Sequence, residues 1–189
     1  MQASRRAARD RRYSTFSGIP MISTDRLILR RPLLEDFEPY QQMWSDPDIL
    51  RHIAPAPFSG EQMWTRFLRQ EGGWQFFGFG YFVIEERSSG RFVGQVGFQE
   101  LRREISPALT GTMETGWTIA PEVQGRGYAS EAAQAAFGWA REHRAGRRVT
   151  AIVSPANLAS IRIVEKLGMR PFAQTEYHDK PVTLFDYIL

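Results

Sequence analysis

A glycine-rich loop before an alanine-rich helical pattern is the part of this sequence whose residue types and spacing most clearly predict chemistry. The stretch APEVQGRGYASEAAQAAFGWA, residues 120–140, sets two glycines and an arginine directly before the helix. Unpaired backbone N–H groups at a helix start bind anions together with the helix dipole. Gly125 and Gly127 let the backbone approach an anion closely, and Arg126 adds a positive charge. The loop therefore predicts a phosphate site.

The spacing of the loop narrows the kind of phosphate site. It matches neither the dinucleotide-binding G-x-G-x-x-G pattern nor the Walker G-x-x-x-x-G-K-[ST] pattern. A P-loop nucleotidase is a poor alternative, because no lysine follows the glycines. The plain alternative is a glycine-rich helix cap that holds no ligand. The residues concerned are Gln124, Gly125, Arg126, Gly127, Tyr128, Ala129 and Ser130.

The segment METGWTI, residues 113–119, reads as a strand with a small, polar face. Glu114, Gly116 and Thr118 alternate with larger residues, so they share one face that could line a ligand cavity. A carboxylate at such a place could serve as a general base. The other interpretation of Glu114 is a solvent-facing strand residue paired with an arginine.

The elements that must position these groups follow from hydrophobic patterning. Strands alternate with helices in the order β, two helices, three strands, helix, strand, helix, two strands. The helix over 127–143 has one continuous apolar face, and the next helix starts at Asn157 and stops at Gly168. This order predicts a mixed α/β layered fold with one central sheet. The strands are expected within 25–31, 80–87, 91–101, 113–119, 148–153, 170–177 and 182–189.

Composition sets outer limits on what the protein does. The 189 residues are 42% hydrophobic and 13% aromatic, which is typical of one globular domain, expected over 19–189. No apolar run approaches the roughly 20 residues needed to span a bilayer, and no apolar core follows the charged N-terminus. The absence of cysteine and the three scattered histidines argue against a metal site. We expect a cytoplasmic protein without a membrane or metal partner.

The first 18 residues form a basic arm. Five arginines against one aspartate give this arm a charge of +4, and the formal total of +3 leaves the remainder at −1. One interpretation is a solvated, disordered tail. The other is electrostatic attachment to RNA, the ribosome or an acidic partner. Nothing in the arm decides between them.

Three segments, taken together, resemble the GNAT N-acetyltransferase superfamily. The loop resembles its pyrophosphate-binding motif Q-x-x-G-x-A, and NLASIRIVEKLGM resembles the next family element. STDRLILRRPLLEDFEPY is similar to the start of the ribosomal-protein N-terminal acetyltransferase branch. The resemblance covers residues 22–189 and keeps the family's order. It implies a single mixed, mostly antiparallel sheet of about six to seven strands flanked by about four helices.

The resemblance implies direct transfer of an acetyl group from acetyl-coenzyme A to an amine, without a metal. Glu114 matches the position of a strand carboxylate that acts as the base, directly or through water. The family splays its fourth and fifth strands apart to admit the cofactor, and we expect Gly116 at that irregularity. The cofactor-binding residues implied are Trp117, Thr118 and Ile119 through their backbone N–H groups, the loop from Gln124 to Ser130, and Asn157.

Two residues on the last helix complete the expected site. Asn157 is a good N-cap, and its family counterpart lies near the acetyl end of the cofactor, so both roles can hold together. Ser160 is the candidate proton donor to the thiolate. Many family members carry a tyrosine four residues further on, where this chain has Val164. An unassisted serine is a poor acid, so orienting the thiolate is its larger expected contribution.

The acceptor is not specified by the sequence. A protein N-terminus, a peptide and a small-molecule amine all stay open, as does a larger acyl group. The aromatic stretch GGWQFFGFGYF, residues 72–82, with Trp44 and Trp64, forms either an acceptor wall or ordinary core packing. A homodimer also stays open, because no segment indicates an interface. The rival functions are a non-catalytic acyl-coenzyme A-binding module and an RNA- or ribosome-associated protein that acts through its arm.

Overall fold

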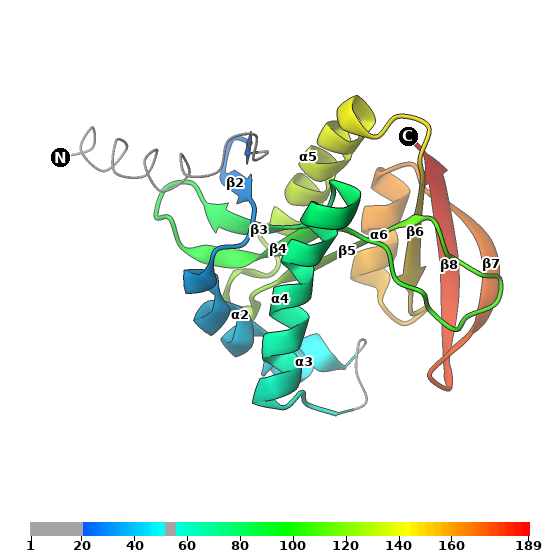
Figure 1. The fold of residues 1–189 in the computed structure, drawn as a ribbon, viewed down its shortest axis with the longest axis horizontal. Helices are drawn as coiled ribbons and strands as arrows, with labels where there is room; N and C mark the ends of the chain where they lie inside the picture. The colour runs from blue at the N-terminus through cyan, green and yellow to red at the C-terminus, as the bar shows by residue number, and fades with distance from the viewer. Residues whose placement is uncertain (1–20, 52–55) are drawn as a thin grey trace.

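The computed structural model describes residues 21–51 and 56–189, which form one sheet with helices packed on both faces (Figure 1). The strands are β1 (Ile22–Ser23), β2 (Leu27–Arg30), β3 (Tyr81–Glu86), β4 (Phe92–Gln99), β5 (Met113–Ile119), β6 (Arg148–Val153), β7 (Arg170–Tyr177) and β8 (Lys180–Ile188). The α-helices are α2 (Phe37–Trp44), α3 (Pro47–Leu50), α4 (Gly60–Phe77), α5 (Tyr128–His143) and α6 (Leu158–Lys166). The basic arm lies outside the described residues.

The sheet order is β1-β2-β3-β4-β5-β6-β8-β7, and every neighbouring pair is antiparallel except β5 with β6. This confirms the expected mixed, mostly antiparallel sheet. It has eight strands rather than six or seven, because the two-residue β1 is too short to produce an alternating pattern. The described residues form five α-helices rather than about four, because the short turn of α3 counts as a helix.

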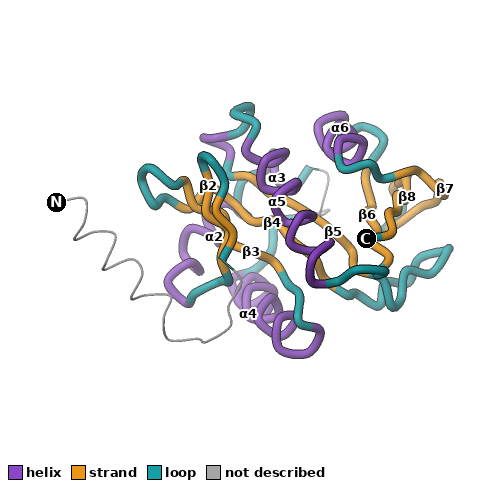
Figure 2. The backbone as a smooth tube through the Cα atoms, turned by 90° about the horizontal axis from the view of Figure 1, so that it is seen from above, coloured by secondary structure: helices purple, strands orange, loops and turns teal. Residues whose placement is uncertain are grey.

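Helices α4 and α5 lie on opposite faces of β4. Gln70 of α4 donates a hydrogen bond to Gln95, at 2.8 Å, whereas Phe98 packs on Phe137 of α5. Alternation along a strand puts Gln95 and Phe98 on opposite faces. Helix α2 packs on α4, and α6 packs on α5 and β6, so α2 and α4 lie on one face and α5 and α6 on the other (Figure 2).

Local chemistry sets where these helices begin and end. Ser59 accepts a hydrogen bond from the Gln62 N–H and completes a capping box, and Gly78 ends α4 in the left-handed conformation. In α5 the predicted apolar face is confirmed: its small side chains lie buried against the sheet, so that the helix approaches closely. The buried members are Ala132, Ala133, Ala136, Phe137 and Ala140, while Ala129 is half-buried.

A buried ionic cluster holds the N-terminal half of the sheet. The Arg30 guanidinium donates to Asp36 at 2.6 Å and to Glu85 at 2.7–2.8 Å, and all three residues are buried. Burial by itself would lower the pKa of Arg30, but the hydrogen bonds and charges of Asp36 and Glu85 raise it above its ordinary value. The cluster ties β2 to β3 and to the turn before α2.

The pairing between β5 and β6 is incomplete. Only Met113 with Val149 and Glu114 with Thr150 are in register, after which the two strands diverge. Beyond Glu114, β5 stays paired with β4 through Ile119, and β6 stays paired with β8 along its length. The sheet therefore opens into a gap between β5 and β6. Gly116 lies inside this gap and remains in register with Gly97, so the irregularity is a loss of pairing rather than a bulge.

We predict that Gly97→Ala destabilises the fold. A Cβ at Gly97 would overlap the Gly80 carbonyl oxygen and lie 2.7 Å from the Tyr81 Cα, and backbone atoms of a paired strand cannot move aside. The expected loss is about 1–3 kcal/mol in the free energy of unfolding, measured by urea denaturation. Gly138→Ala in α5 is the matched control. Its Cβ meets nothing within 4 Å, so we expect a gain of about 0.5–1 kcal/mol. Equal urea concentrations at the unfolding midpoints of the two variants would contradict the prediction.

Candidate active site

The predicted anion loop follows β5 directly, at the open end of the gap. Gly125 and Gly127 have φ of 75° and 80°, the left-handed region that other residues avoid. The first hydrogen bond within α5 runs from the Glu131 N–H to the Gly127 carbonyl, at 3.1 Å. The N–H groups of the preceding helical residues therefore have no acceptor inside α5. The loop has the backbone geometry of an anion site.

Most side chains of the loop form hydrogen bonds within the protein and are not free to bind a ligand. Tyr128 is buried, and its hydroxyl donates to Glu86 at 2.8 Å. The Gln124 amide donates to the Ile119 carbonyl at 3.0 Å, and Ser130 accepts from Gln134. Arg126 is exposed, and its guanidinium donates a hydrogen bond to the Glu122 backbone carbonyl at 3.5 Å. Backbone N–H groups and the Arg126 guanidinium are thus what the loop can offer a phosphate.

The β1–β2 turn holds the loop in place through Arg26, a residue that sequence reasoning missed. The Arg26 guanidinium donates to Glu131 at 2.7 Å and to the Arg126 carbonyl at 2.8 Å. Thr24 donates to Glu131 at 2.6 Å. No local pattern could have revealed this bracket, because its members lie about a hundred residues apart along the chain.

Trp117, Ser160 and Asn157 meet across the gap. The Trp117 indole N–H donates to the Ser160 hydroxyl at 3.3 Å, and the Ser160 backbone N–H donates to the Asn157 side chain at 3.0 Å. Asn157 is therefore the N-cap of α6, as predicted. Helix α6 packs on β6, on the other side of the gap from β5. The hydrogen bond between Trp117 and Ser160 therefore crosses the opening. Val164, at the position of the family's tyrosine, is fully buried.

Glu114 faces the α4 side of β5 and is 6% exposed. Both of its carboxylate oxygens accept from Arg103, each at 2.6 Å, and Gln99 lies at 3.4 Å. Glu114 is thus paired with an arginine, yet buried rather than solvent-facing. Arg103 also donates to the Tyr177 hydroxyl at 2.9 Å. Burial would lower the pKa of Arg103, but the hydrogen bonds and charge of Glu114 raise it.

Tyr81 is a second residue that sequence reasoning missed. It is paired with Gly97, which is paired with Gly116, and its ring crosses Gly97 so that its hydroxyl reaches Gly116 on β5. A Cβ at Gly116 would overlap the Tyr81 hydroxyl oxygen, so the absent side chain makes room for it. Burial, and then the charge of Glu114, raise the pKa of Tyr81 above its ordinary value. Within the described residues this hydroxyl has no hydrogen-bond partner.

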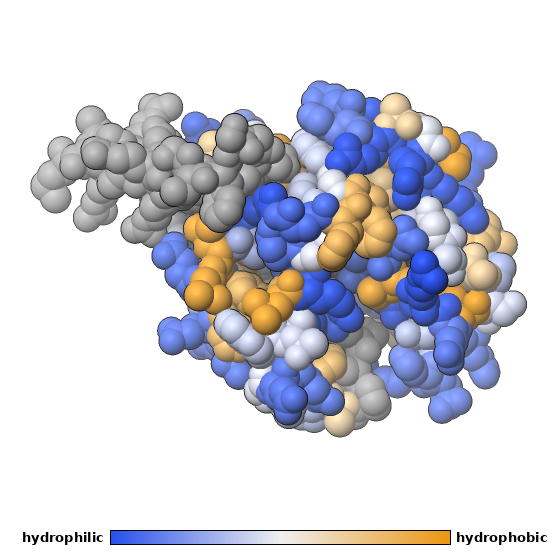
Figure 3. Space-filling model, viewed as in Figure 1, coloured by the Kyte–Doolittle hydropathy of each residue, from blue (hydrophilic) through white to orange (hydrophobic). Residues whose placement is uncertain are grey.

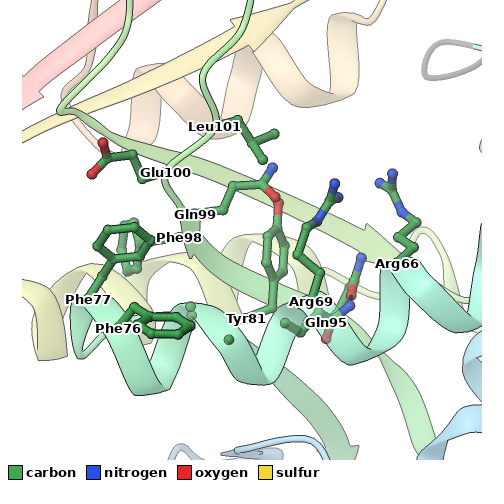
Figure 4. A pocket seen from close by; sticks show the side chains of 14 residues that line it. Arg66, Arg69, Phe76, Phe77, Tyr81, Gln95, Phe98, Gln99, Glu100 and Leu101 are labelled. Carbon is green, nitrogen blue, oxygen red and sulfur yellow. Dashed lines mark hydrogen bonds between the residues drawn. The ribbon is translucent and has the colours of Figure 1, made fainter.

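A cavity of about 250 Å³ opens between α4 and the end of β4, with Tyr81 in its wall. Figure 4 shows the Tyr81 hydroxyl directed toward Gln99, with Arg66 and Arg69 to one side and Phe76 and Phe77 to the other. The aromatic stretch 72–82 therefore lies partly in the cavity wall and partly in the core. Phe76, Phe77 and Tyr81 line the cavity, whereas Trp74 and Phe82 are buried in the core.

The surface above this cavity is apolar at the end of α4. Phe76 is 85% exposed and Phe77 is 47% exposed, and Figure 3 shows hydrophobic side chains gathered there with hydrophilic ones around them. Trp44 is buried, and Trp64 packs its ring on Phe37, so neither contributes to the cavity wall. Of the two interpretations of these tryptophans, core and edge packing describes their contacts.

Two further features concern metals and membranes. Over residues 21–51 and 56–189, no three histidine, aspartate or glutamate side chains come together in a way that could hold a metal ion. Within the same ranges, no helix has both the length and the apolar character needed to cross a bilayer.

Comparisons with known proteins agree with this geometry. Residues 26–170 match the family model described as an acetyltransferase (GNAT) domain. A solved structure from Bordetella pertussis, assigned to the GnaT acetyltransferase family, is 29% identical, with a TM-score of 0.80 over 88% of this chain and 98% of that one. The uncharacterized N-acetyltransferase YnaD of Bacillus subtilis is 28% identical, over 79% of this chain and 82% of its own.

A third comparison shows the fold alone. RimL, a ribosomal L7/L12 alpha-N-protein acetyltransferase solved in complex with coenzyme A, has a TM-score of 0.73, over 90% of this chain and 98% of that one, at 17% identity.

The bracket at the start of α5 generates a pH-dependent prediction. Partial burial would raise the pKa of Glu131, but hydrogen bonds from Thr24 and Arg26 and the charge of Arg26 lower it below its ordinary value. Such a carboxylate stabilises the fold above its unfolded pKa of about 4.3, and the stabilisation is lost as pH falls through the folded value.

We therefore predict that Glu131→Gln lowers the free energy of unfolding at pH 7 by about 0.5–1 kcal/mol, and that the deficit shrinks as pH falls below about 4. Urea denaturation at several pH values measures it. Glu142→Gln, an exposed change in the last turn of the same helix, should show no such pH dependence. A deficit for Glu131→Gln that is constant with pH would rule out the charge as its cause.

Proposed function

Because the chain belongs to the GNAT acetyltransferase family, we propose that it transfers an acetyl group from acetyl-coenzyme A directly to a primary amine. One observation carries this proposal: the loop lies at one end of the gap between β5 and β6, and Tyr81, which lines the cavity, reaches Gly116 at the other end. The loop with Gly125 and Gly127 lies at the open end of the gap, and the Tyr81 hydroxyl lies beside Gly116 within it. A pyrophosphate on the loop and a pantetheine arm along the gap would bring a thioester to the cavity.

The residues proposed to hold acetyl-coenzyme A lie along that path. The N–H groups of the loop and the Arg126 guanidinium would bind the pyrophosphate. Past Glu114, the edge of β5 is not paired with β6, so backbone groups from Trp117 to Ile119 can meet the pantetheine amides and the thioester carbonyl. Asn157 and Ser160 stand across the gap from Trp117. A donor at the developing oxyanion typically contributes about 10²–10³-fold to the rate.

Glu114 is the proposed base for the attacking amine. The amine nitrogen forms a bond to the thioester carbon, the carbon–sulfur bond breaks, and the ammonium proton passes toward Glu114. Since Arg103 already donates to both carboxylate oxygens, transfer through a water fits better than direct contact. A positioned base typically contributes about 10²–10⁴-fold. The carboxylate also offsets the positive charge that develops on the amine nitrogen.

The Ser160 hydroxyl is proposed to donate a hydrogen bond to the leaving thiolate. The Trp117 indole donates to its hydroxyl, which leaves the hydroxyl proton free to point elsewhere. Val164 carries no hydroxyl, so a tyrosine acid at that place is not available to this chain. Orientation of the thiolate, with a proton shared from Ser160, is the contribution that this geometry supports.

Two alternatives lead to different experimental results. A non-catalytic acyl-coenzyme A-binding protein would keep the loop and the gap without using Glu114. An RNA- or ribosome-associated protein would act through the arm, and its binding would weaken steeply with salt and vanish without residues 1–18. Some structural neighbours are ribosomal-protein acetyltransferases, but below 25% identity they support the fold and leave the acceptor open.

The first prediction of this proposal concerns ligand binding. We expect acetyl-coenzyme A and coenzyme A to raise the melting temperature, whereas ATP and NAD do not. A ligand at about 100 times its Kd stabilises a protein by about 2.7 kcal/mol, which a thermal-shift titration detects. No shift at millimolar acetyl-coenzyme A would mean that the loop is only a helix cap. A shift with ATP and magnesium but not with coenzyme A would favour a nucleotidase.

The second prediction concerns turnover. Glu114→Gln should lower kcat by about 10²-fold or more while the thermal shift with acetyl-coenzyme A is retained. Release of coenzyme A thiol from acetyl-coenzyme A and an amine acceptor measures it. Glu104→Gln is the matched control, because Glu104 is exposed on the same loop as Arg103 and lies outside the cavity lining. Full activity in Glu114→Gln would remove this residue from the mechanism.

A further inference from the structure

The cavity beside Tyr81 has a cationic end and an aromatic end. Arg66 and Arg69 project from α4 at one end, and Phe76 and Phe77 lie at the other, with Tyr81 between them (Figure 4). The acidic lining residue Glu100 lies at the phenylalanine end, away from the arginines (Figure 4). The charges of the cavity are therefore separated rather than mixed.

The two arginines carry charge that the protein itself leaves uncompensated. In the part of the chain that the structure describes, neither Arg66 nor Arg69 forms an ion pair with a carboxylate. Arg66 is half-buried, and its guanidinium stacks 4.3 Å from the centre of the Trp44 ring. Partial desolvation, and then the charge of Arg66, lower the pKa of Arg69. Two adjacent positive charges of this kind favour an anion between them.

The neighbouring carboxylate does not supply that anion. Glu114 is taken up by Arg103 through two hydrogen bonds of 2.6 Å. A second hollow on the other side of the same arginines is lined by Phe58, Glu61 and Thr65 among others. Among the described residues, Glu61 forms no ion pair with either arginine. Arginine binds carboxylate and phosphate groups in the same bidentate manner.

We propose that the acceptor is a small primary amine that also carries an anionic group, a carboxylate or a phosphate, which Arg66 and Arg69 bind. The amine then lies toward the Tyr81 hydroxyl and Glu114, near the thioester, while the anionic group lies at the arginine end of the cavity. Polyamines are poor acceptors in this arrangement, since a second ammonium would face the arginines. The inference rests on the proposed acetyltransferase activity and names its substrate class.

The test is calorimetric titration of matched amines into the protein saturated with coenzyme A, which gives binding without turnover. Phosphoethanolamine against ethanolamine, and phenylalanine against phenethylamine, differ by the anionic group and separate phosphate from carboxylate. We expect the anionic member of at least one pair to bind about tenfold tighter or more, as hydrogen bonds to charged groups imply. Spermidine should bind more weakly than that member.

Substitutions of Arg69 test whether the arginines cause the tighter binding of the anionic amine. Arg69→Gln should weaken the preferred anionic amine about tenfold and leave its neutral partner unchanged, with Arg69→Lys between the two. Arg170→Gln, an exposed change on β7, should alter neither. Each variant must retain its thermal shift with acetyl-coenzyme A, which shows that the fold and the donor site are intact. Because the same thermal shift tests the proposed function, a failure of that function can be told apart from a failure of this inference.

Three results would overturn the inference while the acetyltransferase function stands. The first is tighter binding of the neutral amines or of spermidine. The second is equal weakening of both members of a pair by Arg69→Gln. The third is no binding of either anionic amine up to about 10 mM, a very weak affinity.

Discussion

The interrupted pairing between β5 and β6 is the constraint on which the rest of this structure depends. All other neighbouring strands form antiparallel ladders, whereas this parallel pair keeps only two residue pairs in register. Backbone polar groups need partners, and the edge of β5 beyond Glu114 does not find them in β6. An extended ligand with amide groups can take the place of the missing strand. The opening thus begins where the ladder between β5 and β6 ends, after Glu114.

The contacts that join the two halves of the sheet are also the groups proposed for chemistry. Arg103 reaches Glu114 on β5 and Tyr177 on β7, and Trp117 on β5 reaches Ser160 on α6. The loop that carries Arg103 continues to Leu109, which packs on Val182 and Leu184 of β8. A change in this ion pair therefore affects both the alignment of the halves and the charge at the reaction centre. The residue proposed as the base therefore also forms one of the contacts that join the two halves of the sheet.

The proposed acetyl-donor site consists mostly of backbone groups, whereas the proposed acceptor site consists mostly of side chains. The donor side is mostly backbone, with glycines in left-handed conformations and unpaired N–H groups at the start of α5. The acceptor side is mostly side chain, from the arginines and phenylalanines of α4 to Tyr81 on β3. Backbone geometry tolerates many sequences, but a side-chain cavity changes with each substitution on α4.

The sequence by itself determined the features that depend on neighbours along the chain. Turn glycines, the Asn157 cap, the apolar face of α5 and the alternation in β5 all follow from local periodicity and capping. The left-handed glycines of the loop, seven of the eight strands and the family could therefore be predicted. Only the tertiary structure decided that Arg103 clasps Glu114, that Arg26 brackets the loop, and that Tyr81 crosses Gly97 to lie over Gly116. These contacts depend on strand register and on how distant segments pack, and neither residue types nor spacing specify that register.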